Sequence, residues 1–180
     1  MPEDELAAAA GSANAFAELR AATDAVLALR FPSSRNMPSS LESAARDRLV
    51  QWCHGAPGDV SLLCALAART HGDAAHQFLV DARELGEVVW ARGLLTKGVG
   101  LCHGASGNAY AFLALYRATD ESRWLARAQY FARFAIERSD EIAHKADRPD
   151  SLFEGIAGLG CLLADLITDP RAARFPGYEL

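Results

Sequence analysis

Two short segments of this chain place a cysteine and a histidine side by side, directly before a glycine-bracketed turn. They are WCHGAPG at residues 52–58 and LCHGASG at residues 101–107. Thiolate and imidazole are preferred ligands of Zn²⁺. The four side chains Cys53, His54, Cys102 and His103 therefore predict a metal site and a metal-dependent reaction, provided that the fold brings the two turns together.

The spacing of these residues leaves the ligand set open. Cys53 and Cys102 are 49 residues apart, whereas zinc fingers take paired cysteines about two to four residues apart. Both cysteines with His103 would leave one position free, as in catalytic zinc sites, and adding His54 would give a closed structural set. In the competing interpretation the cysteines are buried apolar residues and the histidines cap helices. Because both residue types recur at equivalent turns, we favour the metal site.

The turn at 103–107 follows the turn at 54–58 by 49 residues, and a third glycine-bracketed turn, EGIAG at 154–158, follows 51 residues later. A period near 50 indicates a repeat array. Segments 58–70 and 107–118 are apolar on nearly every face, which predicts buried helices, and segments 74–92 and 121–138 are amphipathic. We therefore expect an all-α fold, an α/α toroid of inner and outer helices with its glycine turns at one end.

The amphipathic segments also predict part of the core. Apolar residues at helical spacing are expected to face inward: Phe78, Leu85, Val88, Val89, Trp90, Trp124, Leu125, Phe131, Phe134 and Ile136. Cys64 and Cys161 lie in apolar segments, so we expect both to be core residues rather than ligands. Asn108 and Tyr110 follow the second turn, where packing and turn roles are expected.

Composition narrows the functional classes. The chain has 180 residues, 51% of them hydrophobic, and a net charge of −5, which predicts a globular domain and disfavours a nucleic-acid binder. No apolar run approaches the ~18 residues of a membrane span, and the opening MPEDELAAAA carries acids where a signal peptide would be basic. Four cysteines then suit metal binding better than disulfides. We expect a cytoplasmic protein, with peripheral contact at the plasma membrane left open.

Three regions are expected along the chain. Residues 1–30 are Ala-rich and helical in propensity. Residues 31–51 form a Pro/Ser-rich connector, in which Ser39 and Glu42 fit a capping box for a short helix. Residues 52–180 are expected to form a single, incomplete domain of helical repeats, with about three to four hairpins.

Four segments together resemble the eukaryotic branch of the lanthionine synthetase C-like (LanC-like) proteins. They are QWCHGAPG at 51–58, GLCHGASGNAYAF at 100–112, SLFEGIAG at 151–158 and ARFPGYEL at 173–180. The resemblance implies an α/α toroid of roughly seven helical hairpins with zinc at its centre. It also implies that Cys53, Cys102 and His103 bind the metal, that His54 does not, and that water or a thiol takes the fourth position.

The resemblance further implies an activity. Bacterial members close lanthionine rings, and eukaryotic members add glutathione to dehydrated serine and threonine residues of damaged proteins. Zn²⁺ would thus activate the glutathione thiol for addition to dehydroalanine or dehydrobutyrine in dehydrated peptides or proteins. Lys97 matches a lysine implicated in glutathione binding, and a cation there suits a tripeptide with two carboxylates.

Two further residues near the turns have weaker assignments. His54 is the expected catalytic residue, acting in proton transfer, and a helix-capping or core role is its alternative. Glu154 replaces the Cys-His unit in the third turn. It could accept a hydrogen bond from a ligand imidazole or interact with a helix N-terminus.

The resembling proteins are about twice as long as this chain, and their earlier repeats carry a GxxHG turn that has no counterpart upstream of Cys53. We therefore expect a fragment; the alternatives are a homodimer that completes the ring, or a non-catalytic zinc- and glutathione-binding adaptor. A glycosidase-like enzyme on a similar scaffold ranks last. That reaction needs two carboxylates across a cleft, and Glu154 alone is suitably placed.

Overall fold

The computed structural model describes residues 3–43 and 46–179, with side chains described for residues 14–42 and 46–179. Residues 1, 2 and 180 of the expected regions 1–30 and 52–180 lie outside it. The described part of the chain is helical and contains no strand, which confirms the all-α class. The helices are α1 (Glu3–Leu27), α2 (Ala56–Ala67), α3 (Gly72–Arg92), α4 (Ala105–Thr119), α5 (Ser122–Glu137), α6 (Ser139–Ile142) and α7 (Ile156–Thr168), with 3-10 turns at Leu41–Ser43 and Ala143–Lys145.

Each glycine turn is followed at once by a helix. Helix α2 begins after Gly55, α4 after Gly104 and α7 after Gly155. Gly55 has a φ of 114°, a conformation that L side chains rarely adopt. Pro57 lies in the first turn of α2, where its missing N–H costs no helical hydrogen bond. The sequence period near 50 therefore corresponds to one such helix per repeat.

A close backbone approach explains the second glycine of each turn. A Cβ atom at these positions would lie within 3.0 Å of the carbonyl oxygen six residues earlier, a distance that real Cβ atoms do not show. The pairs are Gly58 with Trp52, Gly107 with Leu101, and Gly158 with Leu152. The first turn of each helix therefore packs directly against the loop that carries the candidate site residues.

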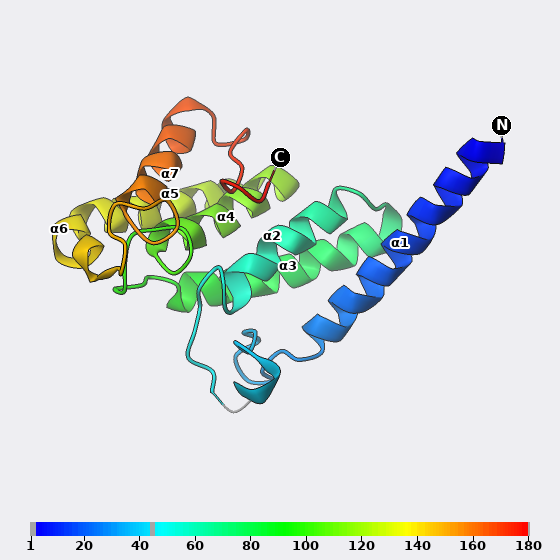
Figure 1. The fold of residues 1–180 in the computed structure, drawn as a ribbon, viewed down its shortest axis with the longest axis horizontal. Helices are drawn as coiled ribbons and strands as arrows, with labels where there is room; N and C mark the ends of the chain where they lie inside the picture. Colours follow the sequence, from blue (N-terminus) through cyan, green and yellow to red (C-terminus); the bar gives the residue numbers. More distant parts are fainter. Residues whose placement is uncertain (1–2, 44–45, 180) are drawn as a thin grey trace.

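The helices form hairpins of an inner and an outer member. Helix α2 packs against α3 and α4, and α4 packs against α5 and α7. Figure 1 shows α2 beside α3 and α4 beside α5. All residues of α4 from Ala105 to Leu115 are buried, whereas α3 and α5 bury one face. The arrangement is consistent with part of an α/α toroid. None of the described helices is long and apolar enough to cross a membrane.

The predicted core is largely confirmed. Phe112 stacks on Trp124 with ring centroids 6.0 Å apart and meets Phe131 edge-on at 5.0 Å. The residues of the amphipathic segments that are buried as predicted are Phe78, Leu85, Val88, Val89, Trp124 and Phe131. Leu125 and Phe134 are partly buried against the same cluster. Cys64 is buried, and burial raises the pKa of its thiol to about 12.

Three core predictions need correction. Trp90 is 38% exposed and Ile136 is 50% exposed, and Cys161 is only partly buried. The Trp90 ring lies at the edge of the core, where the Arg127 guanidinium covers it at 5.0 Å. Ile136 is in the last turn of α5, and Cys161 is on a helix whose Ile156 and Ile167 are also exposed.

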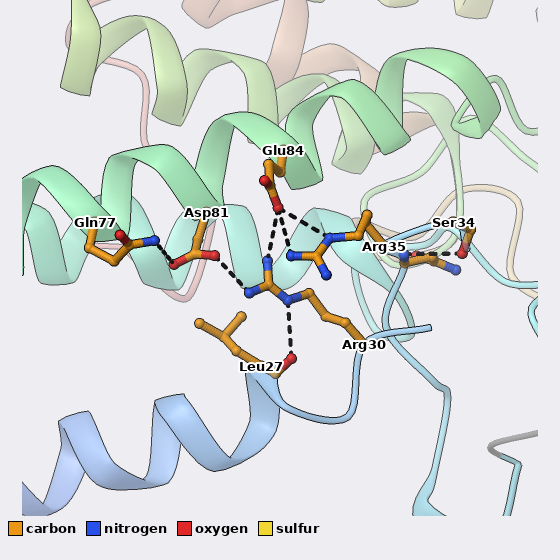
Figure 2. Close-up of polar contacts among 8 residues, drawn as sticks. Leu27, Arg30, Ser34, Arg35, Gln77, Asp81 and Glu84 are labelled. Carbon is orange, nitrogen blue, oxygen red and sulfur yellow. Dashed lines mark hydrogen bonds and ion pairs between the residues drawn. The ribbon is translucent and has the colours of Figure 1, made fainter. Parts of the chain in front are cut away.

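The connector after α1 is fixed to α3 by a charged network (Figure 2). Arg30 Nη2 contacts Asp81 Oδ1 at 2.7 Å, with 12% and 10% of the two side chains exposed. Arg30 and Arg35 both contact Glu84, and Gln77 donates a hydrogen bond to Asp81. Helix α1 itself extends away from the hairpins (Figure 1). The short helix expected before Trp52 is a single 3-10 turn at Leu41–Ser43, and the division of the chain at residues 30 and 51 stays a prediction.

The close approach at Gly107 can be tested by adding one methyl group. We expect Gly107→Ala to lower the free energy of unfolding by about 3 kcal/mol, because the loop carbonyl of Leu101 must move. Gly160 is the matched control: it lies in α7, and a Cβ there meets nothing within 4 Å. Gly160→Ala should therefore raise stability by about 0.5 to 1 kcal/mol. Urea denaturation followed by circular dichroism measures both, and equal effects would contradict this account.

Candidate metal centre

Backbone hydrogen bonds hold the three glycine turns in register. The Cys53 N–H donates to the Cys102 carbonyl oxygen at 3.3 Å, and the Cys102 N–H donates to the Phe153 carbonyl oxygen at 2.7 Å. Cys53, Cys102 and Phe153 each directly precede the first residue of their turn, so the bonds join the same position in consecutive repeats. Side chains from loops 49 residues apart in sequence are thereby brought to one place.

Three of the four predicted metal ligands come together. The Sγ atoms of Cys53 and Cys102 and a ring nitrogen of His103 all lie within 4.8 Å of one another. Cys53 is exposed, whereas Cys102 and His103 are half-buried. Among the described residues, these three side chains are the Cys, His, Asp or Glu side chains that lie close enough to share one metal ion.

His54 lies apart from this group. Its Nδ1 is 3.2 Å from the Ser39 carbonyl oxygen, and its side chain is exposed. The closed set of two cysteines and two histidines is therefore not formed by the described residues. The arrangement has three ligands, which leaves room for a further ligand on a tetrahedral ion.

The electrostatics of the cluster differ from those of isolated side chains. Burial and the neighbouring Cys102 thiol raise the pKa of Cys53 to about 12, and the Cys53 thiol donates to Gln51 Oε1 at 3.7 Å. Burial and the nearby Lys97 cation lower the pKa of His103. These two shifts favour a neutral Cys53 thiol and a neutral His103 imidazole. A bound transition-metal ion would displace the thiol protons, since such ions bind thiolate and neutral imidazole.

Lys97 and Glu154 lie close to the cluster with opposite charges. Lys97 is exposed and acts electrostatically on both Cys53 and His103. The Glu154 carboxylate acts on His103 with the opposite sign. Its Oε2 atom is buried and has no hydrogen-bond partner among the described residues. A buried carboxylate oxygen without a partner is costly, so this atom is available to an imidazole N–H.

Asn108 and Tyr110 have the packing roles that the sequence predicted. The buried Asn108 Nδ2 donates to the carbonyl oxygens of Val50 and Gly93 at 2.8 and 2.9 Å. The Tyr110 hydroxyl donates to Asp165 Oδ2 at 2.7 Å, which joins α4 to α7. Asn108 thus joins α4 to the loop before Cys53 and to the end of α3, and Tyr110 joins α4 to α7.

Sequence reasoning missed an aromatic cluster beside the first ligand loop. Trp52 stacks on Phe175 with ring centroids 4.3 Å apart, and Tyr178 packs edge-on against Trp52 with ring centroids 4.5 Å apart. Glu179 holds this tail segment in place through Arg117 at 2.7 Å. The tail sequence was part of the family resemblance, but no periodic pattern connects it to Trp52.

A cavity of about 320 Å³ opens beside Cys53. Trp52, Cys53, His54 and Asp59 line it, together with apolar residues from the end of α1 and from the connector. Burial raises the pKa of Asp59 to about 6. An acid in the first turn of a helix is common, so no sequence pattern distinguishes Asp59 from other such acids.

Comparisons with known proteins agree with the resemblance noted in the sequence. A sequence model of the lanthionine synthetase C-like protein family matches residues 6–180. The chain is 44% identical over 171 residues to glutathione S-transferase LANCL1 of Danio rerio, covering 95% of this chain and 41% of the relative. It is 46% identical over 155 residues to LanC-like protein GCL1 of Arabidopsis thaliana, covering 84% and 35%. The chain thus spans about two fifths of the length of these relatives.

The shifted pKa of Asp59 predicts a pH-dependent cost in stability. Above pH 6 the native state holds the ionised carboxylate partly buried, so Asp59→Asn should be more stable than the wild type. A pKa of about 6 in the folded chain and 3.8 in the unfolded chain corresponds to a loss of at most about 3 kcal/mol in the free energy of unfolding. We expect about 1 to 2 kcal/mol at pH 7.5, because the side chain keeps some contact with water.

The sign of this effect is checked by lowering the pH. The native wild type takes up its proton first, between pH 6 and 3.8, and so gains stability relative to the unfolded chain. The advantage of Asp59→Asn should therefore vanish near pH 4 in urea denaturation. Asp73→Asn changes an exposed acid in the first turn of α3 and should show no such trend. Equal stabilities of Asp59→Asn and wild type at pH 7.5 would contradict the expected cost.

Proposed function

Because this chain belongs to the lanthionine synthetase C-like protein family, we propose that Cys53, Cys102 and His103 bind Zn²⁺ for a thiol-addition reaction. In this reaction the thiol of glutathione adds to dehydroalanine or dehydrobutyrine residues of peptides or proteins. The proposal rests on one observation above all: three soft ligand atoms lie within 4.8 Å of one another. The name of the zebrafish relative, a glutathione S-transferase, supports glutathione as the thiol.

The residues present fit a zinc ion. Ligand atoms on one tetrahedral zinc lie about 3.5 to 3.8 Å apart, given bonds of about 2.3 Å to sulfur and 2.0 Å to nitrogen. The observed separations, at most 4.8 Å, need only small side-chain rotations to reach this. When bound, zinc would lower the pKa of a coordinated thiol and so supply a thiolate at neutral pH.

The neighbouring side chains have separate roles in this proposal. The Lys97 ammonium attracts a carboxylate of the tripeptide and favours negative charge that develops near the cluster. With its Nδ1–H donated to the Ser39 carbonyl, His54 has an unprotonated Nε2 for accepting a proton. His54 would accept the proton that the glutathione thiol loses and transfer it to the α-carbon after sulfur has bonded to the β-carbon. The Glu154 carboxylate accepts a hydrogen bond from the ring N–H of His103 that does not face the metal, and this bond fixes the ring orientation.

Metal content tests the ligand set. We expect wild-type protein loaded with zinc and passed through a desalting column to retain about one ion per chain. Cys102→Ser should lose most of it, because one of three protein ligands is weakened. Cys161→Ser is the matched control, since Cys161 is a free cysteine of α7 outside the cluster. His54→Gln should also retain zinc. Unchanged zinc content in Cys102→Ser, measured by elemental analysis, would overturn the proposed site.

The orienting role of Glu154 predicts a smaller effect on the same measurement. Glu154→Gln should weaken zinc affinity by about 10- to 100-fold, because the amide accepts a hydrogen bond less strongly than a carboxylate. Competition with a chelator of known affinity measures the change. Affinity equal to that of the wild type would show that Glu154 acts only within its own turn.

Product formation tests the reaction itself. Zinc-loaded protein is incubated with glutathione and a dehydroalanine peptide, and the mass gain of one glutathione per peptide is followed. We expect Cys102→Ser to abolish the gain over background and His54→Gln to slow it by about 10²-fold or more while zinc stays bound. Zinc and glutathione bound without any adduct would instead support an adaptor that does not turn over. That outcome is a real alternative here, because the chain spans about two fifths of its relatives.

A further inference from the structure

We propose that Asp59 binds the ammonium group of the γ-glutamyl residue of glutathione, inside the cavity that opens beside Cys53. This inference rests on the proposed function, since it assigns one end of the thiol substrate to a defined place. It makes Asp59 a specificity-determining residue, one that selects thiols with a free amino group.

The cavity has a size and lining that suit part of a small peptide. Its volume of about 320 Å³ is at the lower end of the range for small-molecule sites. One wall consists of the ligand loop and the first turn of α2, with Trp52, Cys53 and Asp59. The opposite wall is mostly apolar and comes from earlier in the chain: Val26, Leu29, Met37, Pro38 and Leu41. Ser39 and Ser40 also lie on that wall, whereas the carboxylate of the lining, Asp59, lies on the wall next to the metal cluster.

The Asp59 carboxylate lacks a protein cation of its own. Among the described residues no hydrogen bond or ion pair reaches it. Arg30 acts on it electrostatically, but the Arg30 guanidinium is already paired with Asp81 at 2.7 Å (Figure 2). A partly buried carboxylate in this state costs free energy. The start of a helix offsets part of that cost, and a ligand ammonium placed in the cavity would offset the remainder.

The charges around the cluster match the ends of glutathione. The Lys97 charge acts electrostatically on Cys53 and His103. Asp59 and Cys53 both line the cavity. Glutathione has a glycine carboxylate at one end, an ammonium group at the other and its thiol between them. With the carboxylate at Lys97 and the ammonium at Asp59, the sulfur lies near Cys53 and the tripeptide binds in one direction. A thiol without the ammonium group would lose one of these contacts.

Binding measurements with two ligands and two variants test the proposal. Zinc-loaded protein is titrated calorimetrically with glutathione and with N-acetylglutathione, in which the ammonium is replaced by a neutral amide. We expect the wild type to bind glutathione about 10- to 100-fold more tightly, as for a hydrogen bond between charged groups. Asp59→Asn should weaken glutathione binding by a similar factor and leave N-acetylglutathione binding unchanged. Asp73→Asn, at an exposed first-turn acid, should match the wild type with both ligands.

The possible outcomes separate this inference from the proposed function. If the wild type binds glutathione and Asp59→Asn binds it equally well, the role of Asp59 is overturned and the proposed function stands. If the zinc-loaded wild type binds neither ligand, both are overturned. Loss of folding is not expected to obscure the result, because Asn is isosteric with Asp and removes the buried charge. Thermal melting of Asp59→Asn followed by circular dichroism confirms that the variant is folded before titration.

Discussion

Two hydrogen bonds between equivalent backbone positions determine the geometry of the candidate site. They run from Cys53 to Cys102 and from Cys102 to Phe153. Because the donors and acceptors are main-chain groups, the bonds do not depend on the side chains present. Two repeats can therefore offer thiols at this position and the third a phenyl ring, while the loops stay in the same register. The chemistry of the site is separated in this way from the frame that holds it.

The frame also leaves little freedom in the loops. The second glycine of each turn packs against the carbonyl group of its own loop, at a distance that excludes a side chain. Asn108 then joins the loop at Val50 to the end of α3 at Gly93 from within the core. Ligands placed on such fixed backbone are oriented before a metal ion arrives. The three candidate ligand atoms accordingly lie within 4.8 Å of one another.

The sequence predicted the helices from local pattern, and repetition of the Cys-His unit predicted that its side chains would lie close together; the choice of Cys53, Cys102 and His103 among the four came from the family resemblance. Segments apolar on every face had to be inner helices, and a duplicated Cys-His unit had to lie at equivalent loops. The errors fall where position along a helix, rather than its face, decides exposure. Helical spacing assigned Trp90 and Ile136 to the apolar face, but it does not show where the neighbouring helix ends. The Trp90 ring is instead covered by Arg127.

Asp59 illustrates a second limit of sequence reasoning. An acid in the first turn of α2 looks the same whether it faces water or a cavity. Its burial depends on residues 26–41, which reach it only because Arg30 fixes the connector to α3. The contact between Trp52 and Phe175 is similar, since no periodic signal relates two loops so far apart.

That last contact has a consequence for how the protein is made. Phe175 packs on the residue next to Cys53, yet it follows Trp52 by more than a hundred residues. At about 5 to 20 residues per second, a ribosome needs on the order of ten seconds to cover that interval. Throughout it the nascent chain presents the Cys53 loop without its aromatic support. The thiol is then open to oxidants, and its loop gains this support only after Phe175 has been synthesised.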